Sequence, residues 1–283
     1  ILIASTVIPV FPQSAKVKSD SPASSAAVSQ FNDRTAESFY REANEYSKVK
    51  FAEFNEKKLQ FSEALRLRTL TEQKQLAAKY AAILKARPNL ATEDLFYFGM
   101  LHWIAENTDG ADEVLRKYLD AGGTDAANLQ TARGIVVVGA AKKKNFTDAE
   151  RLLADYLKGN PVKVREKIEM ANELAKSYLS ARDFETAARH AADGYALVKS
   201  IFSEQTSRAR GLAEILDRGR TLYEIHSAAG SIEKADQALD DLRKAAVVTE
   251  STGIYFFAVD TLIRYQISTE RKKSALEMYG GLK

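Results

Sequence analysis

The sequence contains no cysteine, few prolines and glycines, and no marked excess of one charge. Its 283 residues include 5 Pro, 14 Gly and 3 His. The lack of cysteine excludes disulfide-stapled scaffolds, thiolate metal sites and cysteine nucleophiles. The scarcity of glycine and proline disfavours an all-β domain, which needs frequent turns. With 41 basic and 38 acidic side chains, the net charge of +3 gives no indication of nucleic-acid binding.

Residues 1–30 differ in composition from the rest of the chain. Residues 1–11 are mostly apolar, but a helix needs roughly 20 apolar residues to cross a bilayer. Residues 14–29 are rich in Ser and Ala, a composition typical of flexible linkers. We therefore expect an apolar signal or anchor remnant and a linker, with an ordinary buried N-terminal element as the alternative. The side chains expected to contact a membrane or a partner are Ile1, Leu2, Ile3, Val7, Ile8, Val10 and Phe11.

Residues 31–88 are expected to form long helices. No Gly or Pro occurs between Phe31 and Arg87, and strong helix formers dominate the segment. The segment exceeds an ordinary helix in length, so we expect a break between Lys58 and Thr71. Pro88 ends the region, because the residue before a proline is pushed out of the α conformation.

Beyond Pro88 the sequence repeats a spacing of small and apolar residues. Four windows share an alanine that is followed by small or apolar residues at the fourth and seventh positions after it. A small residue on one helix opposite an alanine on the next lets two helices approach closely. The anchoring alanines are Ala111, Ala149, Ala187 and Ala235.

This pattern resembles the tetratricopeptide repeat (TPR). The alanines are 38, 38 and 48 residues apart, whereas the family repeat is usually about 34 residues long. Val137 also stands where the pattern has a small residue. The resemblance implies an all-α, TPR-like solenoid of stacked helical hairpins behind the N-terminal helices, with four repeats in residues 89–250 and a capping helical pair in residues 251–283. An irregular helical bundle that matches by chance is the alternative.

The segment from Gly134 to Gly139 is β-branched and bounded by glycine, a composition that also suits a strand. Its position between Leu129 and the Phe146–Ala149 pair instead predicts the buried first helix of a repeat.

No motif for catalysis, a cofactor or a metal is present, and the sequence predicts no small-molecule substrate and no enzyme activity. The three histidines, His102, His190 and His226, lack metal-binding spacing and are expected to be packing residues. Lys142–Lys144 are expected to form a solvated helix end, with a contact to phosphate or anionic lipid as the alternative. Glu166, Glu169 and Glu173 recur at helical spacing and are expected on an exposed face.

Protein binding remains as the predicted function. Stacked hairpins form a concave wall from their first helices, and this wall is the usual binding surface of helical repeats. Three of the residues that the register places there, Phe96, Met100 and Trp103, could equally belong to the core against the N-terminal helices. The full set of candidate binding residues is Phe96, Met100, Trp103, Asn172, Lys176, Arg220 and Glu224.

The stretch from Tyr40 to Trp103, with the motif DLFYFGMLHWIAENTDG that runs on from its end, resembles the N-terminal helical part of exported bacterial proteins of acidobacterial type. Those proteins join TPR-like repeats to a thioredoxin-like domain. The resemblance implies an exported protein in the bacterial periplasm or on the periplasmic face of a membrane. Two functions follow: a non-enzymatic scaffold, as an accessory subunit of a membrane complex, or the partner-binding arm of a thiol–disulfide oxidoreductase. The second needs a CxxC motif, which these residues lack.

Overall fold

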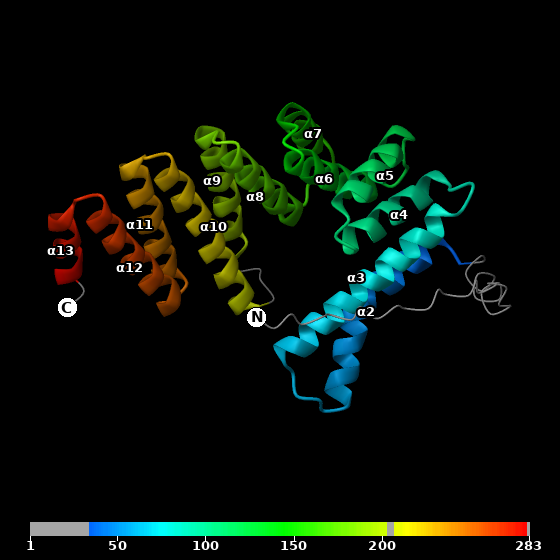
Figure 1. Ribbon diagram of the computed structural model, residues 1–283, viewed down its shortest axis with the longest axis horizontal. Coiled ribbons are helices and arrows are strands. Elements are labelled where there is room, and N and C mark those ends of the chain that lie inside the picture. Colours follow the sequence, from blue (N-terminus) through cyan, green and yellow to red (C-terminus); the bar gives the residue numbers. More distant parts are fainter. Residues whose placement is uncertain (1–33, 203–206, 282–283) are drawn as a thin grey trace, which may run out of the picture. The chain divides into compact units, whose positions relative to one another are not determined.

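The computed structural model describes residues 34–202 and 207–281, and the residues from Ala36 onward form one compact unit. All regular structure in these described residues is helical, and no strand occurs among them (Figure 1). The apolar residues expected to contact a membrane, Ile1 to Phe11, lie outside the described residues. The predicted fold class, an all-α solenoid of stacked helical hairpins, is confirmed.

The first hairpin consists of α2, Ala36–Glu56, and α3, Glu63–Lys85. The chain leaves the helix at residues 57–62, which overlaps the N-terminal end of the interval where a break was expected. Ser62 caps α3, because its side chain accepts a hydrogen bond from the Leu65 amide at 3.2 Å. Phe39 stacks on Tyr80 with ring centroids 4.6 Å apart, which joins the two helices at the end nearest α4.

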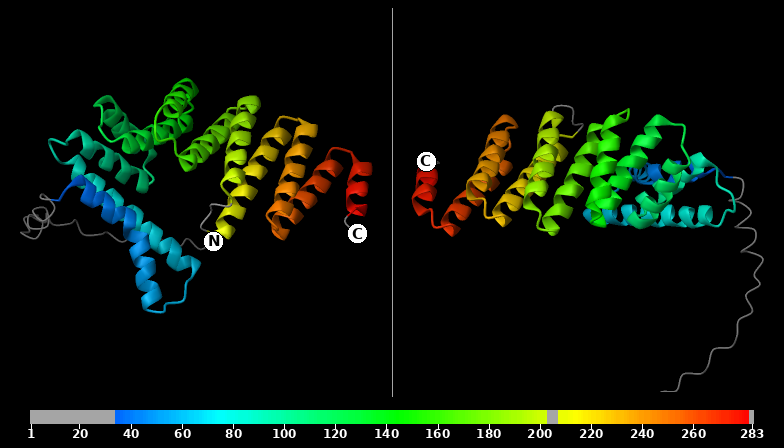
Figure 2. Two further views of the ribbon diagram at one scale, coloured as in Figure 1. Left: turned by 180° about the vertical axis from the view of Figure 1, so that it is seen from behind. Right: turned by 90° about the horizontal axis from the view of Figure 1, so that it is seen from above.

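Five further hairpins follow, and each pairs two helices that are consecutive in the sequence. Within this series α5 contacts α6, α6 contacts α8, α9 contacts α10, and α11 contacts α12, so each hairpin packs against the next. Figure 2 shows α8 to α13 side by side in sequence order. The helices are α4 (Thr92–Ile104), α5 (Thr108–Asp120), α6 (Ala126–Lys142), α7 (Phe146–Lys158), α8 (Val164–Ser180), α9 (Phe184–Ser200), α10 (Arg208–Ala228), α11 (Ile232–Val248), α12 (Thr252–Ser268) and α13 (Lys272–Gly280).

The turns within the hairpins share one backbone geometry. In three successive hairpins a residue with φ of 58°, 57° and 63° (Glu106, Lys144 and Arg182) directly precedes the residue that caps the second helix. The caps are Asn107, Asn145 and Asp183, and each side chain accepts a hydrogen bond from an amide in the first turn. The left-handed residue ends one helix and the cap begins the next, so two residues reverse the chain.

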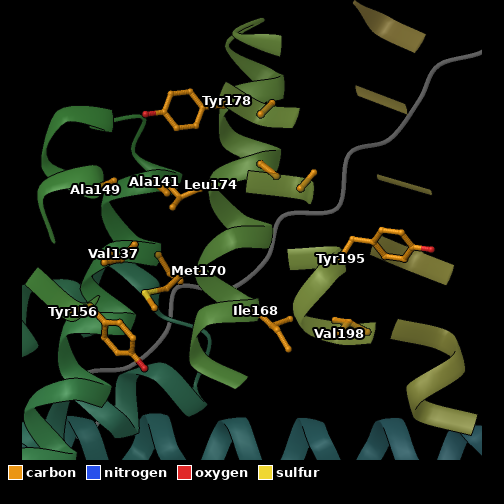
Figure 3. Packing of buried hydrophobic residues seen from close by; sticks show 14 of the residues in the cluster. Val137, Ala141, Ala149, Tyr156, Ile168, Met170, Leu174, Tyr178, Tyr195 and Val198 are labelled. Carbon is orange, nitrogen blue, oxygen red and sulfur yellow. The ribbon is translucent and has the colours of Figure 1, made fainter. Parts of the chain in front are cut away.

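The four anchoring alanines predicted from the sequence are each 0% exposed, which confirms their burial. The prediction that Gly134–Gly139 is helical is also confirmed, because this segment lies inside α6. Val137, which departs from the small-residue pattern, is 0% exposed within the same core. Figure 3 shows this part of the core, with Val137, Ala149, Met170 and Tyr156 close together between neighbouring helices. None of the described helices combines the length and the apolarity needed to span a bilayer.

Candidate binding groove

A groove of about 480 Å³ opens on the side of the stack formed by the first helices of four hairpins. Every residue that lines it belongs to α4, α6, α8 or α10, and none comes from a second helix. This is the surface that the repeat register predicts for binding. The lining residues are Met100, Trp103, Thr131, Gly134, Ile135, Val138, Arg165, Glu166, Glu169, Met170 and Arg210.

The floor of the groove is apolar. Met100, Ile135, Val138 and Met170 are each at most 9% exposed and line its base. Gly134 keeps the floor open because it has no side chain. A Cβ at this position would lie 3.7 Å from the Tyr156 ring and 3.8 Å from the Met170 sulfur, which are ordinary van der Waals contacts. Two methionines give the floor an adaptable shape, since their side chains are flexible and polarisable.

Trp103 lies at one end of the groove and is the single tryptophan of the chain. It also lines a neighbouring cavity of about 710 Å³, to which Asn44 and Gln73 of the first hairpin contribute. The Lys142 ammonium lies 6.0 Å from the centroid of the indole ring, within the range of a cation–π contact. The indole therefore lines both the groove and the cavity beside the first hairpin.

Glu166 lines the wall of the groove and lies at the centre of a hydrogen-bonded junction between helices. The carboxylate of Glu166 accepts hydrogen bonds from Thr131 Oγ1 at 2.7 Å, Tyr156 Oη at 2.8 Å and Lys163 Nζ at 3.1 Å. Burial, together with the bond to Glu166, raises the pKa of Tyr156 to about 12. The expectation that Glu166 belongs to a plain exposed face is wrong, because this carboxylate ties α6 and α7 to α8; Glu169 beside it is exposed.

The far end of the groove carries two guanidinium groups that share one carboxylate. Arg165 Nη1 lies 2.6 Å from Glu214 Oε2, and Arg210 Nε lies 3.0 Å from Glu214 Oε1. Burial by itself would raise the pKa of Glu214, but the hydrogen bonds from the two arginines outweigh it and hold the pKa below its usual value. The carboxylate stays ionised, and it fixes both arginines at the rim of the groove.

The structure places the seven predicted binding residues in three different environments. Met100 and Trp103 line the groove, whereas Phe96 is 5% exposed and packs between the rings of Tyr97 and Tyr118. Phe96 is thus a core residue, and the two rings that it contacts belong to α4 and α5 rather than to the N-terminal helices. The other four residues do not line the groove: Asn172, Lys176, Arg220 and Glu224.

These four residues lie further along α8 and α10. Asn172 is partly buried, and within the described residues its Oδ1 has no hydrogen-bond partner. Lys176 is exposed. Arg220 and Glu224 form an ion pair with each other at 2.7 Å on the exposed surface of α10, a pair that contributes little to stability.

Of the residues that line the groove, only Met100 and Trp103 were predicted from the sequence. The repeat spacing, however, indicated two more. Gly134 and Val138 stand 38 residues after Phe96 and Met100, the same distance that separates Ala149 from Ala111. Carrying the register of the first repeat into the second would have found both. The residues on α8 and α10 were not accessible in this way, because they come from the first two turns of α8 and the first turn of α10.

The three histidines serve in packing. His190 is 4% exposed, its Nε2 lies 2.7 Å from Glu150 Oε1, and its ring stacks on Tyr178. Burial lowers the pKa of His102 and of His226, so both favour the neutral form. Among the described residues no group of three or more His, Asp or Glu side chains is arranged to hold a metal ion.

Comparison with known proteins shows that the chain resembles solved structures in fold but shares little sequence identity with them. The chain matches no protein-family model and no curated protein. The crystal structure of the apo form of RapI is 12% identical, covers 90% of this chain and 75% of its own, and superposes with a TM-score of 0.52. The fold of the chain is TPR-like.

Two further crystal structures are similar at lower TM-scores. BtubC (BKLC) from P. vanneervenii is 14% identical over 77% of this chain and 94% of its own, with a TM-score of 0.46. A kinesin light chain with nearly identical TPR-like repeats from Podosopora anserina is 15% identical over 89% of this chain and 93% of its own, with a TM-score of 0.38.

Proposed function

We propose that this TPR-like chain is a non-enzymatic protein-interaction scaffold that binds a peptide segment of a partner protein in the groove of the first helices. The observation that carries the proposal is that all the residues lining the groove belong to the first helices of successive hairpins. An apolar floor with Trp103 at one end and two arginines at the other suits a segment with one or two large apolar side chains. Such side chains would be buried against Ile135, Val138 and Met170, while the backbone of the segment stays near Arg165 and Arg210.

Gly134 provides a test that separates filling of the groove from loss of stability. Gly134→Leu places a side chain into the open floor, and Gly134→Ala adds only a Cβ with ordinary contacts. Gly134→Ala removes a helical glycine and is expected to stabilise α6 by about 0.5–1 kcal/mol, and the melting temperature of each variant shows whether its fold is retained. Peptides selected on the full chain from a displayed library should bind the Ala variant and fail to bind the Leu variant.

Trp103 supplies an independent readout, because all tryptophan fluorescence of the chain comes from this residue. Titration with a selected peptide should change the Trp103 emission of the wild-type chain and of Gly134→Ala, but not of Gly134→Leu. Peptides that bind the Leu variant with unchanged affinity would show that the groove is not the binding site and would overturn the proposal.

We also propose, from the composition of residues 1–30, that the scaffold acts on the exported side of a bacterial membrane as an accessory subunit of a membrane complex. Alternatively, the chain is the partner-binding arm of a thioredoxin-like oxidoreductase. Fractionation of cells that produce the native gene product, followed by intact-mass measurement, tests both. Recovery from the cytosol would contradict an exported location, and a mass that includes a CxxC domain would favour the alternative.

A further inference from the structure

The outer half of the first hairpin has no core of its own. The last buried residue of α2 is Ala43, and the first buried residue of α3 is Thr69. Every residue between these two is exposed or partly exposed. A cavity of about 410 Å³ lies between the helices here, so their facing side chains do not close the gap. Figure 1 shows this end of α2 and α3 pointing away from α4.

Large apolar side chains are nevertheless concentrated at this end. Phe61 is 64% exposed and Leu59 is 51% exposed, and both belong to the turn that joins the two helices. The Phe61 ring touches Phe51 edge-on, with centroids 6.3 Å apart, and this contact leaves most of the ring in solvent. Val49 and Leu67, on the flanking helices, are 51% and 53% exposed.

The same end carries an excess of positive charge. Residues 47–72, which include Glu72, the partner of Arg68, contain six basic and four acidic side chains. Ion pairs at 2.9 Å or less neutralise Lys50, Arg66 and Arg68. Lys57 and Lys58 at the turn are exposed, and no acidic residue separates them from Phe61, although Lys57 interacts electrostatically with Glu53.

The small size of the turn favours a lipid bilayer over a folded protein as its partner. A stable protein interface covers roughly 800 Å² on each side and seats its anchor residues in pockets. A turn of six residues is much smaller than such an interface, and its apolar side chains, Leu59 and Phe61, do not line the neighbouring cavity. The interface of a lipid bilayer requires neither, because it accepts exposed apolar side chains and offers phosphates to flanking lysines.

We propose that the turn of the α2–α3 hairpin docks on an anionic lipid bilayer. Leu59 and Phe61 enter the boundary between headgroups and acyl chains, and Lys57 and Lys58 contact the lipid phosphates. This site shares no residue with the groove, so the proposed peptide binding in the groove does not depend on whether the turn binds lipid. It gives the scaffold a fixed end on the membrane, with the hairpin stack extending from it.

Co-sedimentation of the full chain with vesicles tests the proposal. Vesicles of phosphatidylcholine with phosphatidylglycerol should bind the protein, and vesicles of phosphatidylcholine alone should bind it far less. Lys57→Gln with Lys58→Gln should weaken binding about 30-fold. Leu59→Ser with Phe61→Ser should weaken it at least tenfold, on the order expected for two exposed apolar side chains. The turn residues are exposed, so the circular dichroism spectrum of each variant should match the wild type.

The C-terminal helix supplies a matched control. Leu276 and Tyr279 of α13 are 70% and 60% exposed, comparable to the turn residues, and their replacement by Ser should leave vesicle binding unchanged. Retained binding of the Leu59→Ser, Phe61→Ser variant would assign membrane contact to another segment, residues 1–11 included, and overturn the proposal. Failure to bind either vesicle, together with lysine-dependent binding to polyglutamate, would overturn it in favour of an acidic protein partner.

Discussion

Gly99 of α4 lies against Leu115 of α5 so closely that a Cβ at Gly99 would stand 2.5 Å from Leu115 Cγ and Cδ2. Leu115 is 0% exposed and cannot retreat into solvent. The absence of a side chain at Gly99 therefore sets the distance between the two helices of the first repeat.

Gly99→Ala is expected to destabilise the protein by about 1–3 kcal/mol, because relief of the overlap must displace a buried leucine. Gly134→Ala is the control, since its Cβ meets only ordinary contacts and the substitution favours the helix. Chemical denaturation followed by circular dichroism measures both. Equal effects at the two glycines would contradict the packing described here.

Ala187 tests the anchoring position of the third repeat. The residue is 0% exposed on α9, so Ala187→Leu should overpack the hairpin and cost about 1–3 kcal/mol. Ala192 on the same helix is exposed, and Ala192→Leu should change stability by less than about 0.5 kcal/mol. A melting temperature that stays the same in Ala187→Leu would count against the anchoring role.

Asp112 joins two repeats through a buried carboxylate. Its side chain is 7% exposed and accepts hydrogen bonds from Arg116 Nε at 2.9 Å and from Lys143 Nζ at 2.8 Å. Lys143 is exposed at the end of α6, as expected for Lys142–Lys144, and its ammonium also reaches back to this buried carboxylate. Asp112→Ala should lower the free energy of unfolding by about 1.5–3 kcal/mol, the range for hydrogen bonds to charged groups.

The control for Asp112 is Glu113, whose exposed carboxylate forms an ion pair within the same helix, with Lys117. Glu113→Ala should leave the melting temperature nearly unchanged, because exposed pairs of this kind contribute little. Comparable losses from the two substitutions would show that helix propensity, rather than the junction between repeats, dominates.

The ionisation of Glu150 is expected to make the stability of the junction between α7 and α9 depend on pH. Burial by itself would raise the pKa of Glu150, but the hydrogen bond from His190, assisted by Arg189 and Tyr178, outweighs it and lowers the pKa. A carboxyl with a lowered pKa stabilises the fold above its unfolded pKa, near 4.5, and this contribution is lost as the pH falls through its folded value.

Glu150→Gln should therefore be less stable than the wild type at neutral pH, and the difference should vanish in acid. Thermal melts over a pH series measure this difference. Glu185→Gln, on the exposed surface of α9, should follow the wild-type curve throughout. A difference between Glu150→Gln and the wild type that persists at low pH would contradict the role of the ionised carboxylate.

The sequence alone determined the helices and the buried alanines of the repeats. Helix propensity and apolar periodicity act within a few neighbouring residues, so they can be recognised without knowledge of the fold. The strand-like run in α6 was assigned correctly for a related reason, because its place in the repeat register outweighed its β-branched composition. The turn geometry was less accessible, since Glu106, Lys144 and Arg182 adopt φ values for which glycine would be the local signal.

The tertiary structure decided which side chains meet. Arg165 and Glu214 are 49 residues apart in the sequence, and they face one another only because α8 and α10 are first helices of successive hairpins. Phe96 and Met100 lie one turn apart on α4, yet Phe96 packs into the core beside Tyr118 while Met100 lines the groove. Spacing along a helix fixes the face to which a residue belongs. What that face meets depends on the neighbouring helices, whose positions follow from packing between segments distant in the chain.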